Sequence, residues 1–282
     1  MTKNIIAIDM DGTLLNEQQQ ISQENIDAIK QRAKQDLVYI CSGRDSFDIR
    51  TILKRSNLQI PVASLNGSLI LDGDTKIFSN PFTNREIRAM FQHIEKLPFK
   101  LFTNKGNYNA PNFIERMQDF FQKYGEAANQ EREQNNLTYL HAYEKSTDSE
   151  LYQLGLLDDE ELEVYKLAIY LPESELSRQF YQTIKTEFQL PMTSSGLSDY
   201  ELLPLGVDKG KTYDLMLDYF HLSDARKVAI GDSPNDLPMM AVADVSFAVG
   251  NASEQVKDFC THVVPSNDEH GVAYVLNNIE SF

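Results

Sequence analysis

The chain has 282 residues, 41% of them hydrophobic, which is enough for one large or two moderate domains with a substantial core. Its net charge of -16, from 26 basic and 42 acidic residues, argues against nucleic-acid binding, because such a surface repels phosphate backbones. No apolar stretch approaches the roughly 20 residues that cross a membrane, so a membrane protein is not expected.

The two cysteines and the N-terminal residues indicate a compartment. Cys41 and Cys260 form no metal-binding pair, and the first predicted strand follows the N-terminus without a secretion signal. We therefore expect a reduced, cytoplasmic protein, either a monomer or a weak homo-oligomer.

The first predicted strand, residues 5–8, runs directly into two aspartates. Asp9 and Asp11 are spaced by one residue, and Gly12 permits a tight turn after them. Ligands of α/β sheets bind where strands end, so both carboxylates are expected at a ligand-binding edge. Such oxygens suit Mg²⁺, and a carboxylate can act as a nucleophile. The alternative is a plain Asp-Gly turn. A calcium-binding EF-hand loop fits badly, because its glycine is the sixth residue from the first aspartate and Gly12 is the fourth.

The rest of the first third repeats the strand–turn–helix pattern. Strands are predicted over residues 37–41, 62–65, 68–71 and 76–78, and helices over 22–35 and from about residue 46. Asn66 and Gly67 are a strong hairpin signal between the second and third of these later strands.

The pattern changes near Pro81. Amphipathic helices are predicted over residues 83–97, 112–124 and 173–188, and strands over 100–103 and 164–171. The polar, acidic stretch 125–163 is too long for a structureless connection, so we expect short helices or strands within it. We therefore expect residues 83–190 to form a separate α/β module inserted into the first one.

The opening pattern returns after Pro191. Strands are predicted over residues 200–203, 227–231, 245–249 and 262–264, and helices over 208–219, 236–242 and 272–279. Alternating strands and helices predict an α/β fold, a doubly wound, largely parallel, Rossmann-like core built from residues 1–82 and 191–282.

Three later stretches carry candidate functional residues. At the end of the second strand, the Ser42 hydroxyl and the backbone at Gly43 can hold phosphate oxygens, although Ser-Gly alone is an ordinary turn. Lys209 lies at a predicted helix start, where the helix dipole opposes a positive charge unless a bound phosphate offsets it. The alternative there is a solvated lysine pair with Lys211, which is also the rival for the same role.

The third stretch is GDSPND at residues 231–236. Asp232 and Asp236 follow a buried strand with the spacing i, i+4, and Asn235 lies between them. Two carboxylates at this spacing after a buried strand are candidate functional residues, and the plainer alternative is a polar helix cap.

Taken in order, the strings DMDGT at 9–13, SGR at 42–44, DKGK at 208–211 and GDSPND resemble motifs I to IV of the haloacid dehalogenase-like (HAD) phosphatases. Residues 248–252 and 268–273 resemble the Cof-type branch, which carries an α/β cap between motifs II and III. The resemblance implies that Asp9 is the nucleophile and Asp11 the general acid and base. It implies phosphate binding by Ser42, Gly43, Lys209 and Asn235. It implies a Mg²⁺ site at Asp9, the backbone carbonyl of Asp11, and Asp232, with Asp236 binding a metal water or orienting Lys209.

The implied activity is Mg²⁺-dependent hydrolysis of a small phosphorylated metabolite through an aspartyl-phosphate. Sugar phosphates, flavin mononucleotide, pyridoxal phosphate and nucleotides all remain open as substrates. The alternatives are a phosphosugar mutase and a non-catalytic protein that binds phosphorylated metabolites on the same scaffold. The cap is expected to close over the substrate and set specificity. Residues 104–109 are a polar loop candidate for that role, although a plain surface loop is the favoured interpretation there.

Overall fold

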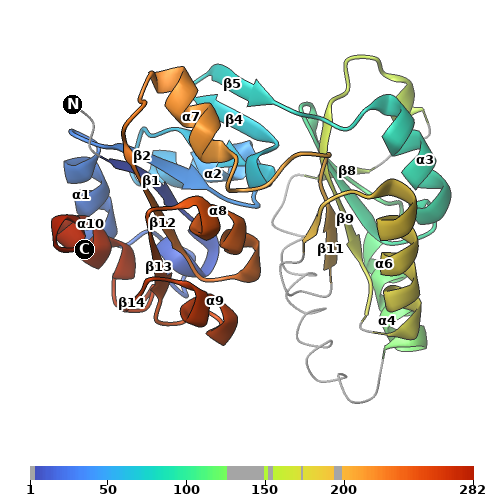
Figure 1. Ribbon diagram of the computed structural model, residues 1–282. Coiled ribbons are helices and arrows are strands. Elements are labelled where there is room, and N and C mark those ends of the chain that lie inside the picture. Colours follow the sequence, from blue (N-terminus) through green and yellow to red (C-terminus); the bar gives the residue numbers. More distant parts are fainter. Residues whose placement is uncertain (1–3, 126–148, 152–154, 173, 194–198) are drawn as a thin grey trace. The chain divides into compact units, whose positions relative to one another are not determined.

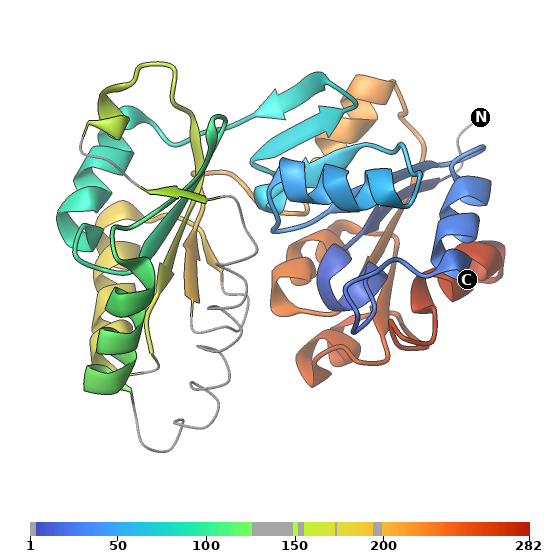
Figure 2. The same cartoon turned by 180° about the vertical axis from the view of Figure 1, so that it is seen from behind.

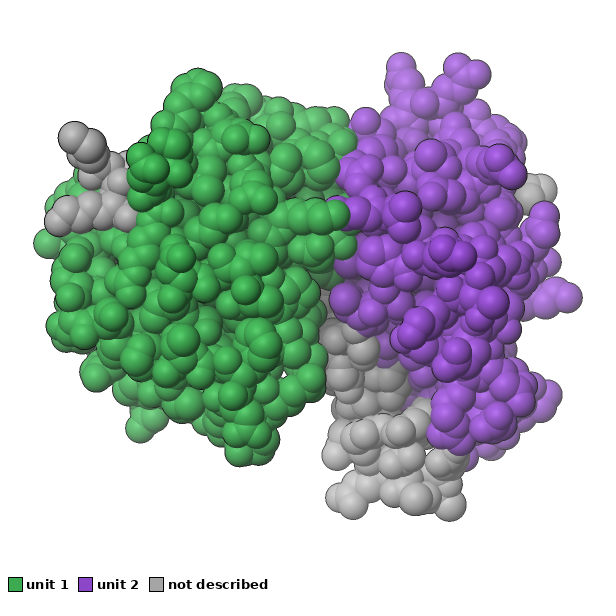
Figure 3. Space-filling view, in the orientation of Figure 1, with its two compact units in different colours: residues 1–79, 207–282 green, residues 80–206 purple. Residues whose placement is uncertain are grey.

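The structure is a computed structural model that describes residues 4–125, 149–151, 155–172, 174–193 and 199–282. The chain divides into two compact units (Figure 3). The core unit comprises residues 1–79 and 207–282, and the inserted unit comprises residues 80–206. Most of the predicted acidic connection at 125–163 lies outside the described residues. Within it the structure has strand β8 (Ser149–Leu151) and a 3₁₀ turn at Leu156–Asp158.

The core unit contains an eight-stranded sheet in the order β14-β13-β12-β1-β2-β3-β4-β5. Its strands are β1 (Asn4–Ile8), β2 (Leu37–Cys41), β3 (Val62–Ser64), β4 (Leu69–Asp72), β5 (Thr75–Ser79), β12 (Arg226–Gly231), β13 (Val245–Val249) and β14 (His262–Val264). The strands from β14 to β3 run parallel, and β4 and β5 continue as an antiparallel meander. The predicted doubly wound, largely parallel α/β fold is therefore confirmed.

Strand β1 lies in the middle of this sheet. Every residue of β1 is buried, and Ile8 pairs with Ile230 of β12 and with Ile40 of β2. A strand with neighbours on both edges and helices on both faces reads as a continuous apolar run, as residues 5–8 do. The chain leaving β1 therefore emerges between two other strand ends.

Helices cover both faces of the core sheet (Figures 1 and 2). They are α1 (Gln23–Arg32), α2 (Ser46–Arg55), α7 (Thr212–Phe220), α8 (Leu237–Val242), α9 (Glu254–Phe259) and α10 (Gly271–Asn278). The Ser22 Oγ caps α1 by accepting a hydrogen bond from the backbone N–H of Asn25 at 3.2 Å. Helix α9 was not predicted, because its six residues are too few to show a clear amphipathic period.

The inserted unit has a six-stranded sheet in the order β10-β11-β9-β6-β7-β8. Its other strands are β6 (Phe99–Thr103), β7 (Gly106–Asn109), β9 (Val164–Tyr170), β10 (Met192–Thr193) and β11 (Asp199–Leu202). Its long helices are α3 (Asn84–Ile94), α4 (Phe113–Tyr124) and α6 (Glu175–Phe188). Thr83 and Glu86 form a capping box at the start of α3.

Two predicted boundaries and one predicted loop differ from the structure. The module was predicted over residues 83–190, but residues 191–206 belong to the inserted unit, because β11 pairs with β9 through Leu202 and Leu167. Of the predicted loop at 104–109, only residues 104 and 105 form a turn, since residues 106–109 are strand β7, which pairs antiparallel with β6. The helix predicted from residue 208 begins at Thr212, and Asp208 instead accepts a hydrogen bond from the backbone N–H of Lys211 at 3.0 Å.

Along the described stretches of the chain, no helix combines the length and the apolar character needed to cross a membrane.

Candidate active site

Three neighbouring parallel strands end at the predicted motifs. Asp9 follows β1, Ser42 follows β2 and Asp232 follows β12. The backbone N–H of Asp9 donates to the carbonyl of Ile230 at 3.0 Å, which continues the β1–β12 ladder up to the aspartate itself. The carboxyl ends of parallel strands meet at one edge of a sheet, so motifs far apart in the sequence come together here.

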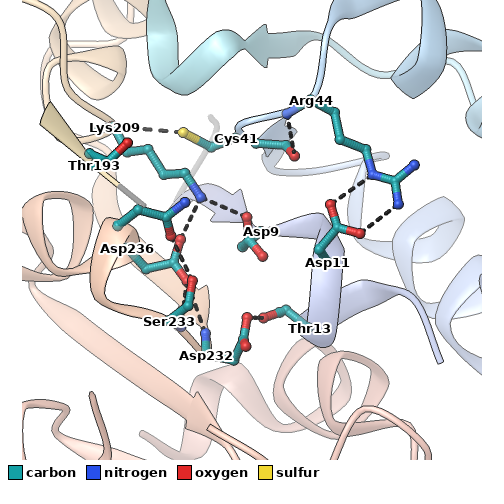
Figure 4. Close-up of polar contacts among 12 residues, drawn as sticks. Asp9, Asp11, Thr13, Cys41, Arg44, Thr193, Lys209, Asp232, Ser233 and Asp236 are labelled. Atoms are coloured by element: carbon teal, nitrogen blue, oxygen red, sulfur yellow. Dashed lines mark hydrogen bonds and ion pairs between the residues drawn. The ribbon is translucent and has the colours of Figure 1, made fainter. Parts of the chain in front are cut away.

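The Lys209 ammonium lies between Asp9 and Asp236 at this edge (Figure 4). Its Nζ donates to Asp9 Oδ1 and to Asp236 Oδ1, each at 2.6 Å, and the residue is 1% exposed. The turn before α7 is fixed by the hydroxyl of Thr212, which donates to the Lys209 carbonyl at 2.6 Å. Lys211, the rival lysine, is exposed. Of the two lysines, Lys209 is therefore the one that the fold brings to the aspartates.

A third carboxylate joins the group. Asp9, Asp232 and Asp236 each offer an oxygen, and these oxygens lie within 4.8 Å of one another. Burial and the charge of Asp236 raise the pKa of Asp9 well above its ordinary value, although Lys209 opposes this shift. Burial and Asp236 also raise the pKa of Asp232 to about 7. Burial lowers the pKa of Lys209, but Asp236 and Asp9 more than offset this, so the lysine remains charged.

This surplus of carboxylates over ammonium groups fits a divalent cation. A few carboxylate oxygens, with room for water and phosphate ligands, are what Mg²⁺ takes in proteins. The loop after β1 is shaped to approach Asp232: Gly12 has a φ of 72°, and a Cβ there would lie 2.6 Å from Asp232 Oδ2. Thr13 Oγ1 donates to Asp232 Oδ1 at 2.9 Å and so orients that carboxylate.

Asp236 is held by more partners than Asp232. Its Oδ1 accepts from Lys209, and its Oδ2 accepts from the backbone N–H groups of Asp232 and Ser233 at 2.9 and 3.1 Å. Of the two roles anticipated for Asp236, these contacts favour orienting Lys209 over binding a metal water.

Apart from Lys209, the residues predicted to bind phosphate lie in the turns after β2 and β12. Ser42 is 1% exposed, and its Oγ accepts from the backbone N–H of Arg44 at 3.2 Å. Gly43 leaves little space, since a Cβ there would lie 3.3 Å from Asn66 Oδ1. Asn235 Oδ1 accepts from the Ser233 hydroxyl at 2.7 Å. The fold thus brings hydroxyl, backbone and amide groups to the edge where Asp9 lies.

Sequence reasoning missed three residues that shape this edge. Arg44 and Thr13 stood within the motif strings but had no role, and their ion pair and hydrogen bond become visible only in the folded chain. Asn251 Nδ2 donates to the Gly12 carbonyl at 2.7 Å and fixes the loop after β1. Asn251 belongs to residues 248–252, which resemble the Cof-type branch but which the sequence did not connect with the site.

Cys41 also lies beside Lys209, with its Sγ 3.9 Å from the lysine carbonyl. Burial raises the pKa of the Cys41 thiol to about 12. The thiol therefore stays protonated at neutral pH and is a poor nucleophile.

A family model described as haloacid dehalogenase-like hydrolase matches residues 6–276. The chain belongs to this family. A curated relative from Bacillus subtilis, 5-amino-6-(5-phospho-D-ribitylamino)uracil phosphatase YwtE, is 30% identical, and the match covers 98% of each chain. The HMP-PP phosphatase of Yersinia enterocolitica is 26% identical over 97% of this chain and 94% of its own. The predictions of a Cof-type HAD protein and of a HAD-type phosphatase are thereby confirmed.

Solved structures agree with the HAD fold. A haloacid dehalogenase-like hydrolase from B. subtilis superposes with a TM-score of 0.79 at 23% identity, covering 98% of this chain and 99% of that one. The protein TM0651 from Thermotoga maritima gives a TM-score of 0.76 at 21% identity, with 98% and 97% of the two chains covered. At these identities the likeness concerns the fold.

Proposed function

We propose that this HAD phosphatase uses Mg²⁺ to hydrolyse a small phosphomonoester through an aspartyl-phosphate on Asp9. The observation that carries the proposal is the buried contact of Lys209 with Asp9 and Asp236 beside Asp232. It supports a site built to neutralise a phosphoryl group next to a nucleophilic carboxylate.

Asp9 is the proposed nucleophile. Lys209 holds its Oδ1, so the Oδ2 atom would attack phosphorus. A bond from Asp9 to phosphorus forms while the bond from phosphorus to the ester oxygen breaks. Ser42, the backbone at Gly43, Lys209 and Asn235 are proposed to bind the phosphoryl oxygens during this transfer.

Asp11 is the proposed general acid and base. In the first step its carboxyl proton passes to the departing ester oxygen, which leaves as an alcohol. In the second step the Asp11 carboxylate takes a proton from the water that attacks phosphorus. This releases inorganic phosphate and restores both Asp9 and the protonated Asp11.

Asp9 and Asp232 are the proposed side-chain ligands for Mg²⁺, with the backbone carbonyl of Asp11. When bound, the cation supplies positive charge that offsets the phosphoryl oxygens and the carboxylates. Thr13 keeps Asp232 turned toward that position through its hydrogen bond.

The first substrate to test is the compound that names the 30% identical relative, 5-amino-6-(5-phospho-D-ribitylamino)uracil. It joins a panel of sugar phosphates, flavin mononucleotide, pyridoxal phosphate and nucleotides. The inserted unit, between motifs II and III, is proposed as the cap that selects among them.

The test is phosphate release from this panel with Mg²⁺ and with a chelator, by the wild-type chain and by Asp9→Asn. We expect wild-type release that needs Mg²⁺, and a folded Asp9→Asn with turnover lowered by at least about 10³-fold, because the nucleophile is lost.

A matched control is Asp74→Asn. Asp74 is in the same unit, but it is exposed and pairs with Arg50 on the surface, so its activity should equal that of the wild type. Normal turnover by Asp9→Asn would refute the nucleophile, and undiminished release in the chelator would refute the Mg²⁺ requirement.

A further inference from the structure

Arg44 contacts the proposed acid directly. Its Nε donates to Asp11 Oδ2 at 2.7 Å and its Nη2 donates to Asp11 Oδ1 at 2.5 Å, so the guanidinium faces both carboxylate oxygens (Figure 4). Such a two-pronged pair fixes the direction of the carboxylate as well as its position. A lysine, with a single ammonium, cannot reproduce this geometry.

The guanidinium is itself held from two other directions. Its Nη1 donates at 2.6 Å to the Oδ2 atom of Asp48, which lies in the first turn of α2. Its Nη2 also donates to Gln19 Oε1 at 2.7 Å. The Arg44 carbonyl accepts from the backbone N–H of Leu65 at 2.9 Å. Burial lowers the pKa of Arg44, but the contacts with Asp11 and Asp48 raise it by more than burial lowers it. The guanidinium is therefore permanently charged.

Asp11 depends on this support more than its neighbours do. Its side chain is 50% exposed, whereas that of Asp9 is 6% exposed and lies against Lys209. A half-exposed aspartate can change rotamer freely unless a partner holds it. Proton transfer requires the two heavy atoms to be within about 2.6–3.2 Å, and small displacements cost large factors in rate.

We propose that Arg44 is a positioning residue, which holds Asp11 where it exchanges a proton with the ester oxygen. The inference rests on the proposed phosphatase mechanism. Arg44 can keep hold of one carboxyl oxygen while the other carries the proton, so the support persists in both protonation states of Asp11.

The rival role for Arg44 is direct binding of the substrate phosphoryl group. The contacts disfavour it, because all three guanidinium nitrogens already donate, to Asp11, Asp48 and Gln19. Arginine has five N–H groups, and four of them are used in this way.

The two roles differ in their dependence on the leaving group. An aryl ester such as p-nitrophenyl phosphate releases a stabilised phenolate that needs little protonation, whereas an alkyl phosphate releases an alkoxide that needs an acid. The value of kcat/KM covers the steps up to the first phosphoryl transfer, so it isolates this difference from the later attack of water. The experiment therefore measures kcat/KM of Arg44→Lys for p-nitrophenyl phosphate and for the best alkyl phosphate of the substrate panel.

We expect Arg44→Lys to lose about 30-fold or more on the alkyl ester and less than about 3-fold on the aryl ester, since general acid catalysis contributes on the order of 10²–10⁴-fold. In an Asp11→Asn background, Arg44→Lys should lower aryl kcat/KM by less than about 2-fold, because no acid remains to be positioned. Arg50→Lys is the control, since Arg50 lies on α2, close to Arg44 in the chain, but pairs with exposed Asp74, and it should change neither value.

Two results would overturn the proposal in an active enzyme. Equal losses on both esters would indicate phosphoryl binding or a general structural defect, and so would losses that multiply with those of Asp11→Asn. If Arg44→Lys does not fold, Asp48→Asn replaces it, because it removes one anchor of Arg44 without touching Asp11, and it should show the same selectivity at smaller size. A wild-type chain that cleaves neither ester would instead refute the proposed function, and the positioning role would fall with it.

Discussion

Each unit of the molecule buries a lysine beside a carboxylate, and the two lysines lie in different backbone settings. In the inserted unit, Lys166 of β9 donates to Glu201 of β11, and its Nζ lies 4.3 Å from the centroid of the Phe102 ring. In the core unit, Lys209 is shared between Asp9 and Asp236, with Asp232 beside them. Both lysines are at most 3% exposed, so burial alone does not separate them.

The difference lies in what the surrounding backbone does. Lys166 and Glu201 project from paired strands within a sheet, where an ion pair fixes register and satisfies buried charge. The carboxylates around Lys209 lie where strands end or just beyond, and they outnumber the ammonium group. An ion pair between paired strands stabilises a fold, whereas several carboxylates around one ammonium at strand ends are poised to take up a cation or a ligand.

Lys209→Met tests the functional side of this comparison and has the largest expected effect. Lys209 supplies the only ammonium among the described contacts of Asp9 and Asp236. Without its positive charge the transferred phosphoryl group is less stabilised in the transition state, so kcat/KM should fall at least about 10³-fold. Phosphate release on the best substrate measures this. Lys211→Met is the matched control, and a result in which Lys211→Met is the more damaging change would reverse the assignment of the two lysines.

Lys166→Met tests the structural side. Leaving Glu201 buried without this ammonium should lower the free energy of unfolding by about 3–5 kcal/mol, measured by urea denaturation. The double variant Lys166→Met/Glu201→Leu should recover most of that loss, because both charges are then gone. A cost below about 1 kcal/mol for the single variant would show that the pair is not a stabilising contact.

Much of this architecture could be predicted because it depends on local patterns. The buried strands at 5–8 and 227–231 are apolar runs that stop at aspartates, and their parallel pairing brings Asp9 and Asp232 to one edge. A local sequence pattern does not show which other strand a given strand pairs with. Residues 200–203 were predicted to be a strand and were placed in the core, but β11 pairs with β9 of the inserted unit.

Side-chain contacts across the site could not be predicted for the same reason. Arg44 and Asp11 lie on different strand-to-helix connections, and nothing in the strings SGR or DMDGT states that one guanidinium will meet both oxygens of one carboxylate. The start of α7 at Thr212 was not predictable either, since a helix was predicted from residue 208. Gly210 passes so close to the Pro238 carbonyl that a Cβ would lie 2.5 Å from that oxygen, a tertiary contact invisible in the sequence.

Thr13→Val sharpens the comparison because it removes a hydrogen bond that orients Asp232, one of the carboxylates near Lys209. Valine keeps the shape of the side chain but removes the hydroxyl that donates to Asp232 Oδ1. Losing a hydrogen bond to a metal ligand typically lowers metal affinity by about 10–100-fold, so the Mg²⁺ concentration for half-maximal activity should rise by that factor. The maximal rate at saturating Mg²⁺ should change much less. An unchanged Mg²⁺ requirement would show either that Asp232 is not a Mg²⁺ ligand or that Thr13 does not orient it.

The pH dependence of stability gives the smallest effect and tests the charge surplus itself. The pKa of Asp232 is raised from 3.8 to about 7 by burial and by Asp236, so the folded chain holds this proton over a range in which the unfolded chain has lost it. Its contribution to stability is therefore complete below about pH 4 and is lost as the pH rises through 7.

Asp232→Asn cannot titrate at this position. In chelator, its thermal midpoint should therefore rise relative to that of the wild type as the pH goes from acidic to about 8, by about 2 °C or more for a chain of this size. At the upper pH, added Mg²⁺ should raise the thermal midpoint of the wild type above that of Asp232→Asn, because a cation then takes the place of the proton. Asp74→Asn, which changes an exposed aspartate paired with Arg50 and leaves the site intact, is measured alongside as a reference. A midpoint difference for Asp232→Asn that does not change with pH would mean that the folded chain holds no extra proton at Asp232, and the proposed excess of carboxylates near Lys209 would be refuted.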